Sequence, residues 1–140
     1  MMNIVLLSVL LAGFGSQILK LLILLVRHRK LSWHDVLLTG GMPSSHAAFV
    51  VSLATIIYLT EGVSTLFVMS LVFAIIVLRD AFGVRRSVGL EGKAIQQLFK
   101  MHHLKSKFHY SMGHTPLQVF VGSLIGFGTA VLVHYYVLIA

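Results

Sequence analysis

Long apolar runs alternate with shorter polar stretches along the whole chain. Apolar residues dominate from Asn3 to Val26, from Ala47 to Leu78 and from Pro116 to Ile139, and most polar residues lie in 27–46 and 79–113. A helix needs about 20 apolar residues to cross a bilayer, so the first and last runs are each long enough to span it. Because polar and apolar positions do not alternate within the runs, we predict helices and not the strands of a membrane barrel.

The middle run, 47–78, is too long for one crossing and short for two. Polar and turn-forming residues interrupt it near its centre: Thr60, Glu61, Gly62 and Ser64. A carboxylate inside the bilayer is costly, whereas these residue types are typical of a tight turn. We therefore predict a helical hairpin of two short arms, which makes four crossings in all.

Composition agrees with a membrane protein. Of the 140 residues, 57% are hydrophobic and 11% are charged, and the mean hydropathy is +0.93. These values exclude a soluble, disordered or nucleic-acid-binding domain, and the absence of cysteine excludes thiol catalysis. We expect residues 1–140 to form a single membrane-embedded domain of the all-α class, with about four transmembrane helices and one interfacial amphipathic helix.

The net charge of +7 is unevenly distributed. All Lys and Arg residues except Lys20 lie in two stretches, 27–43 and 79–113, which four crossings would place on the same side. The positive-inside rule then predicts that both stretches face the cytoplasm and that both termini lie outside, in a bacterial-type cytoplasmic membrane. In the second stretch, apolar residues between Leu90 and Phe99 recur at helical spacing, which predicts the amphipathic helix in the membrane interface.

Lys20 lies inside the first apolar run, where a lysine is a functional hypothesis by default. The alternative is that its side chain snorkels to the interface. A stripe on one helix face argues against that alternative, because its members follow helical spacing: Gly13, Gln17, Lys20, Leu24 and Arg27. We expect Lys20 and Arg27 to point together into the bundle.

Three further polar strings lie at the ends of predicted helices. Residues 40–46 end in Pro43-Ser44-Ser45-His46, so free N–H groups and the positive end of a helix dipole lie there, although a simple N-cap would look the same. Residues 80–86 carry Asp80, Arg85 and Arg86, which also fit a helix end flanked by arginines. Residues 113–118 place His114 and Gln118 one turn apart.

Two other features have ordinary structural interpretations. Gly122 and Gly126 form a small-xxx-small pair, which indicates close helix packing and could support a homo-oligomer. His102, His103 and His109 lack the regular spacing of metal ligands, so we interpret them as interfacial residues.

The four-crossing topology brings all these polar strings to one membrane face. Several cations, two helix N-termini and two histidines on one face suit the binding of a phosphate group and its transfer. A phosphate group is therefore the expected ligand at this face.

The strings also resemble a known family. Lys20 and Arg27 match the K-x6-R part of a K-x6-R-P motif, with His28 in place of proline, and Pro43-Ser44-Ser45-His46 matches P-S-G-H with Ser45 in place of glycine. In the third motif, S-R-x5-H-x3-D, Gln118 stands where the aspartate follows the histidine. Together with Asp80-x-x-Gly83-Val84-Arg85-Arg86 and Gly113-His114-Thr115-Pro116, these strings resemble the divergent branch of the type 2 phosphatidic acid phosphatase superfamily, which is related to acid phosphatases and vanadium-dependent haloperoxidases.

The resemblance implies a membrane lipid phosphatase that needs no metal and no cofactor and acts on a phosphomonoester or pyrophosphate of a prenyl lipid or glycerolipid. A lipid phosphate in the surrounding membrane is then the expected partner. It implies that His114 attacks phosphorus to form a phosphohistidine and that His46 protonates the leaving oxygen. The implied phosphate-binding residues are Lys20, Arg27, Ser44, Ser45, Arg85 and Arg86.

The superfamily's aspartate orients the attacking histidine, and two residues are candidates for its role here. Gln118 could accept a hydrogen bond from the ring but supplies no charge, whereas Asp80 could supply a carboxylate from another helix. If neither acts in this way, the alternative function is a non-catalytic anionic-lipid binder or a small membrane transport component.

Overall fold

A computed structural model describes residues 4–28, 41–102 and 113–139 of the chain, with the backbone alone for Arg27 and His28. Within these ranges the secondary structure is helical, without strands, so the predicted all-α class is confirmed. The helices are α1 (Ile4–His28), α3 (Ser45–Glu61), α4 (Thr65–Phe82), α5 (Val84–Met101) and α6 (Pro116–Ile139).

The predicted hairpin between α3 and α4 is confirmed. Gly62 ends α3 with a φ of 68°, a left-handed value that favours glycine, and its N–H donates to the Tyr58 carbonyl. Ser64 then caps α4, since its hydroxyl accepts from the Phe67 N–H at 3.1 Å and donates to Glu61 at 2.9 Å. The carboxylate is exposed at the turn, outside the packed bundle.

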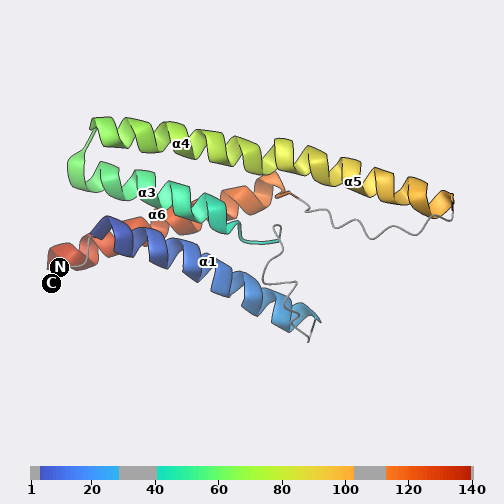
Figure 1. Ribbon diagram of the computed structural model, residues 1–140. Helices are drawn as coiled ribbons and strands as arrows, with labels where there is room; N and C mark the ends of the chain where they lie inside the picture. The colour runs from blue at the N-terminus through green and yellow to red at the C-terminus, as the bar shows by residue number, and fades with distance from the viewer. Residues whose placement is uncertain (1–3, 29–40, 103–112, 140) are drawn as a thin grey trace.

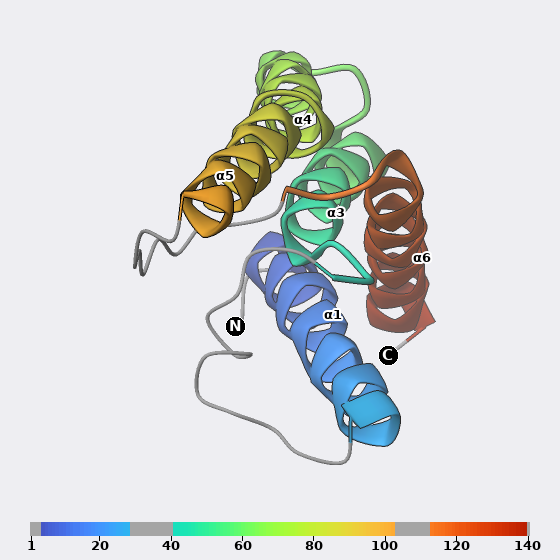
Figure 2. The same cartoon turned by 90° about the vertical axis from the view of Figure 1, so that its right-hand side faces the viewer.

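Helix α3 is the centre of the bundle. It contacts α1, α4 and α6, and Figure 2 shows it between these three helices. Its buried positions are mostly small or aliphatic, which lets neighbouring helices approach closely: Ala47, Ala48, Val50, Ser52, Ala54, Ile56 and Ile57. Helix α1, helix α3, the α4–α5 pair and helix α6 run antiparallel to one another in chain order, so both termini lie at one end of the bundle (Figure 1).

Helix α6 packs on α3 through its glycine pair. A Cβ atom added to Gly122 would lie 2.2 Å from the Ser44 carbonyl oxygen, and one added to Gly126 would lie 2.4 Å from that of Ala48. Both glycines are buried. The predicted packing role is therefore confirmed within the chain, and the homo-oligomer stays a prediction.

Helix α1 packs on α3 in a similar way. The Phe49 ring of α3 occupies the space above Gly13, where a Cβ atom would lie 2.0 Å from the ring. The buried hydroxyls of Ser8 and Ser52 are hydrogen-bonded to each other at 2.8 Å. A buried hydroxyl without such a partner would be destabilising, so this hydrogen bond favours the observed position of α1 along α3.

The outer surface of the bundle is apolar. On α4, side chains such as Met69 and Ile76 are 64% and 61% exposed. In the described residues, α1, α4 with α5, and α6 provide three stretches long and apolar enough to cross a membrane, and α3 is a shorter apolar helix. Such a surface is stable against lipid and not against water, as expected of an integral membrane protein.

The predicted amphipathic helix is present as α5, but its direction differs from a helix laid across the end of the bundle. Only Gly83 separates it from α4, and the helical hydrogen bonds continue on both sides: the Gly83 N–H donates to the Arg79 carbonyl, and the Ser87 N–H donates to that of Gly83. Helix α5 therefore continues roughly along α4, past the other helices (Figure 1). Its place in the membrane interface stays a prediction.

Candidate active site

Three polar segments meet at the end of the bundle opposite the termini. The start of α3 is held by Ser44, which is fully buried and whose hydroxyl accepts from the Ala47 N–H at 3.4 Å. The Ser44 N–H donates to the Gln118 carbonyl of α6 at 3.2 Å. This bond fixes the α3 N-terminus against the first turn of α6, and the partly buried Ser45 begins α3 beside it.

The segment before α6 is fixed against the α4–α5 junction. The His114 N–H donates to the Ala81 carbonyl at 3.1 Å. Next to it, a Cβ atom added to Gly113 would lie 2.4 Å from the Arg86 nitrogen and 2.5 Å from the Arg85 carbonyl carbon. Only glycine allows this close approach of two backbones, which sets the position of His114.

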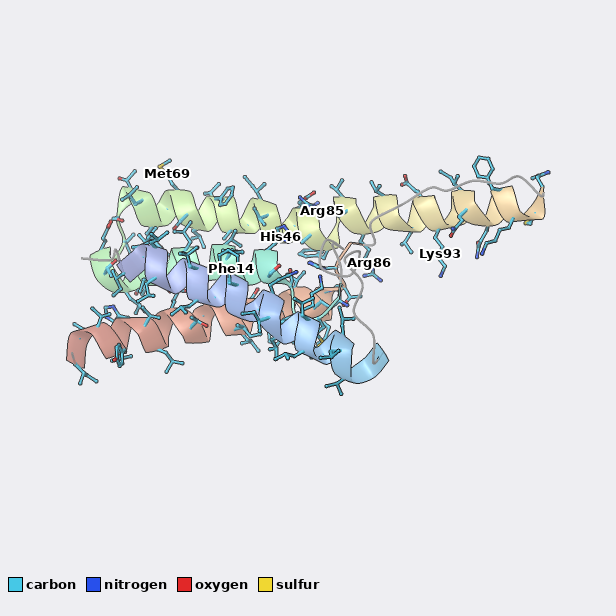
Figure 3. All side chains as sticks on the ribbon, turned by 60° about the horizontal axis from the view of Figure 1, so that its bottom comes forward. Phe14, His46, Met69, Arg85, Arg86 and Lys93 are labelled. Carbon is cyan, nitrogen blue, oxygen red and sulfur yellow. The ribbon has the colours of Figure 1, made fainter. Side chains whose placement is uncertain are left out.

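A small pocket of about 20 Å³ lies between these segments. It is lined by residues of α3, α4, α5 and the segment before α6: His46, Val77, Asp80, Ala81, Arg85, Gly113 and His114. The centroids of the His46 and His114 rings are 6.3 Å apart, and the ring planes are tilted by 53°. Figure 3 shows His46 close to Arg85 at this junction, with Lys93 farther along α5.

Lys20 approaches the same region from α1. Its side chain is 5% exposed, so it lies inside the protein and does not snorkel along the outer surface. Its Cε atom is 3.2 Å from the position of a Cβ atom on Gly41, which has a φ of 94°. The charge of Lys20 acts on both His46 and His114. The side chain of Arg27, predicted to accompany it, lies outside the described part of the protein.

The surroundings of His114 favour a neutral imidazole. Its side chain is 7% exposed. Burial, together with the positive charges of His46, Lys20 and Arg85, lowers the pKa of His114 to about 4 from its ordinary value of 6.5. A neutral histidine has a free ring nitrogen at physiological pH, which is the form that can act as a nucleophile.

Gln118 does not orient the His114 ring, contrary to one of the two alternatives raised by the sequence. Its Oε1 atom accepts from the Thr115 N–H at 2.9 Å, while its own N–H donates to the Thr115 hydroxyl at 3.3 Å. This reciprocal pair is a capping box, which Thr-x-x-Gln at the start of α6 is suited to form. The Nδ1 atom of His114 is buried and has no hydrogen-bond partner among the described residues.

Asp80 lies in the pocket, paired with Arg85. The Arg85 Nε donates to the Asp80 Oδ2 in an ion pair, with the side chains 52% and 36% exposed. Arg85 lines the pocket and Arg86 does not. The backbone of Arg86 instead faces Gly113, and Figure 3 shows the two arginines at the junction.

The structure thus brings His46, Asp80, Arg85 and His114 together in one pocket and leaves Arg86 outside it. Ser44 and Ser45 lie at the start of α3, next to His46, and Lys20 acts on both histidines through its charge. The sequence interpretation missed the roles of Gly113 and Thr115, although the Thr-x-x-Gln spacing is a recognisable capping signal. Of the histidines interpreted as interfacial, His102 is exposed at the end of α5, and His103 and His109 lie outside the described residues.

Comparison with known proteins agrees with the resemblance found in the motifs. The model of a family described as the Divergent PAP2 family matches residues 1–129. A Bacillus subtilis (strain 168) protein, described as the uncharacterized membrane protein YuiD, is 36% identical over 151 residues, which cover 96% of each chain. No solved structure matches. The chain therefore belongs to the Divergent PAP2 family and is a membrane protein related to phosphatases.

Proposed function

We propose that this protein is a lipid phosphatase that hydrolyses a phosphomonoester or pyrophosphate of a prenyl lipid or glycerolipid. The observation that carries the proposal is the pair of histidines, His46 and His114, that line one pocket together with Arg85. Two histidines supply a nucleophile and an acid, and an arginine fork binds phosphate oxygens. The surrounding apolar bundle favours a substrate that is itself a lipid.

In the first step, a ring nitrogen of His114 attacks phosphorus, a nitrogen–phosphorus bond forms and the bond to the leaving oxygen breaks. His46, in its protonated form, gives its proton to that oxygen. The positive charges of Arg85 and Lys20 stabilise the charge that develops on the phosphoryl oxygens. The lowered pKa of His114, about 4, supports this division, because the nucleophile must be neutral.

In the second step, water attacks the phosphohistidine. His46, now neutral, takes a proton from the water, the nitrogen–phosphorus bond breaks, and inorganic phosphate leaves. Both histidines then return to their starting states. Arg27, Ser44 and Ser45 remain the proposed additional phosphate contacts, through the α3 N-terminus in the case of the serines.

Arg79 and Arg85 lie at this end of the bundle, and all Lys and Arg residues except Lys20 belong to the sequence stretches 27–43 and 79–113, which supports an active site that faces the cytoplasm, with both termini outside. The lipid substrate would then be presented with its phosphate at the cytoplasmic surface.

The proposal is tested by phosphate release from a panel of prenyl and glycerolipid phosphates by the purified protein. Wild-type protein should release phosphate, and His114→Ala should abolish release while lipid-phosphate binding is largely kept, since binding belongs to the cations. His46→Ala should slow the first step mainly for substrates with poor leaving groups, because a good leaving group needs little protonation, and should slow hydrolysis of the phosphohistidine for all of them.

One observation favours a second candidate, a non-catalytic binder of anionic lipids. The Nδ1 atom of His114 has no described partner, and Gln118 is engaged in the capping box. A histidine mechanism that lacks its orienting carboxylate can lose about 10⁴-fold in rate, as in serine proteases. Binding of lipid phosphates without release from any of them would favour this candidate.

A further inference from the structure

The Asp80 carboxylate is paired with Arg85, and a bound phosphate would compete with it for that arginine. Arg85 donates to Asp80 in the structure, and both side chains are partly exposed at the pocket. A phosphate group offers the guanidinium a dianion with several acceptor oxygens, which the arginine fork binds in bidentate geometry. Under the proposed function, Arg85 turns to the substrate, and Asp80 is left as a carboxylate without its cation.

The freed Asp80 carboxylate could pair with either histidine of the pocket, and the structure favours one of them. The charges that act on His46 are those of Arg85 on α5, Lys20 on α1 and Asp80 on α4. His46 and Asp80 also line the same pocket, and the His114 ring lies beside that of His46. The charges that act on His114 are those of His46, Lys20 and Arg85. The Nδ1 atom of His114 makes no hydrogen bond with any described residue, so the Asp80 carboxylate does not accept from it.

We propose that Asp80 is the positioning residue of His46: when phosphate engages Arg85, the freed carboxylate pairs with the His46 imidazolium and holds it charged as the proton donor. This inference rests on the proposed function and assigns Asp80 to the acid, whereas the superfamily's own aspartate serves the nucleophile. In the free protein, the ion pair with Arg85 keeps the Asp80 carboxylate away from His46 until phosphate binds. Without substrate, Arg85 neutralises Asp80, and in its presence the carboxylate offsets the cations that surround His46.

Leaving-group dependence distinguishes the two possible roles of Asp80. A carboxylate that orients His114 would matter for every substrate, because attack by His114 is common to all. In the first step, a carboxylate that keeps His46 protonated matters only where the leaving oxygen needs a proton. The comparison is therefore between a lipid phosphate, with a poor alkoxide leaving group, and an aryl phosphate such as para-nitrophenyl phosphate, with a good one.

Asp80→Asn is the informative variant, because the amide oxygen still accepts from Arg85 and only the charge is lost. In a single turnover, it should lower the rate at which the lipid phosphate loses its leaving group by about 10–100-fold, within the range attributed to general acids, and leave that rate on the aryl phosphate within about threefold. The alkaline limb of its kcat–pH profile on the lipid should move to lower pH, and Asp80→Glu should restore part of the rate. Glu91→Gln, the same charge change at an exposed site outside the pocket, is the matched control.

Equal losses on both substrates would overturn the inference and assign Asp80 to His114 or to the structure. Unchanged rates on both substrates would overturn it as well. Absence of phosphate release by the wild-type protein from either substrate would contradict the proposed function itself, and the role of Asp80 would fall with it.

Discussion

Gly113→Ala tests the geometry on which the whole site depends. The added methyl group would lie 2.4 Å from the Arg86 nitrogen, 2.5 Å from the Arg85 carbonyl carbon and 2.8 Å from the Arg86 Cα. Ordinary contacts between heavy atoms are about 3.5–4.0 Å, so the two segments must separate by about 1 Å. All three neighbours are backbone atoms, and none can yield by a rotamer change. The backbone of Gly113 has no positive φ, so steric contact alone is tested.

The separation would act on His114 directly. The hydrogen bond from the His114 backbone N–H to the Ala81 carbonyl, with an N···O distance of 3.1 Å, would be stretched or lost. We expect the free energy of unfolding to fall by about 1–3 kcal/mol, as for other overpacked sites. Displacement of the nucleophile by about 1 Å should lower kcat by about 10²-fold.

The assay is phosphate release from a lipid phosphate in detergent, together with thermal unfolding of the same samples. Gly128→Ala is the control, because a Cβ atom at that α6 position would meet nothing within 4 Å. The control should keep full activity and stability. Gly113→Ala protein with wild-type activity and unchanged unfolding would refute the close approach between the His114 segment and the α4–α5 junction.

Three other predictions follow from the described geometry. Gln118→Ala should lower the free energy of unfolding by about 1 kcal/mol through loss of the capping box, with kcat within a few-fold of wild type, and Gln118→Asp should not raise the rate; a large gain with aspartate would contradict the capping role. Because protonation removes the nucleophile, kcat/KM should fall only as the pH drops through about 4, the pKa of His114, and an acid limb near 6.5 would show that burial does not act as described. In this cysteine-free chain, a single cysteine at Val63, which is 78% exposed, should be labelled from outside the cell and one at Lys100 should not, and the reverse pattern would place the site on the other face.

The membrane helices follow closely from the sequence, because each is set by local rules. The turn at 60–64 was predicted from the cost of a carboxylate in the bilayer, and the structure ends α3 at Glu61 and caps α4 with Ser64. Pro116 and the apolar run after it predicted α6 with its observed bounds. The direction of α5 was not predicted from the sequence, because it depends on the backbone at Gly83, where the helical hydrogen bonds continue from α4 into α5.

The site was only partly predictable for a different reason. Residue types and topology brought His46, His114 and Lys20 to one end, but they could not assign hydrogen-bond partners. The pairing of Asp80 with Arg85, for example, depends on a distance between two side chains that spacing along the chain does not fix. The same holds for Gly122, whose nearest neighbour is the Ser44 carbonyl of α3.

The central claim is that the phosphoryl group is transferred to His114 and forms a phosphohistidine before it is released. It is tested most directly by trapping phosphate on the His46→Ala protein with para-nitrophenyl phosphate and an alkaline quench, because phosphohistidine survives alkali and the good leaving group needs no acid. Without His46 to activate water, the intermediate should accumulate. The account predicts acid-labile phosphate on His114, found by peptide mass spectrometry and absent from the His46→Ala/His114→Ala double variant. Steady release of phosphate by the His46→Ala protein with no phosphate on His114 would contradict it.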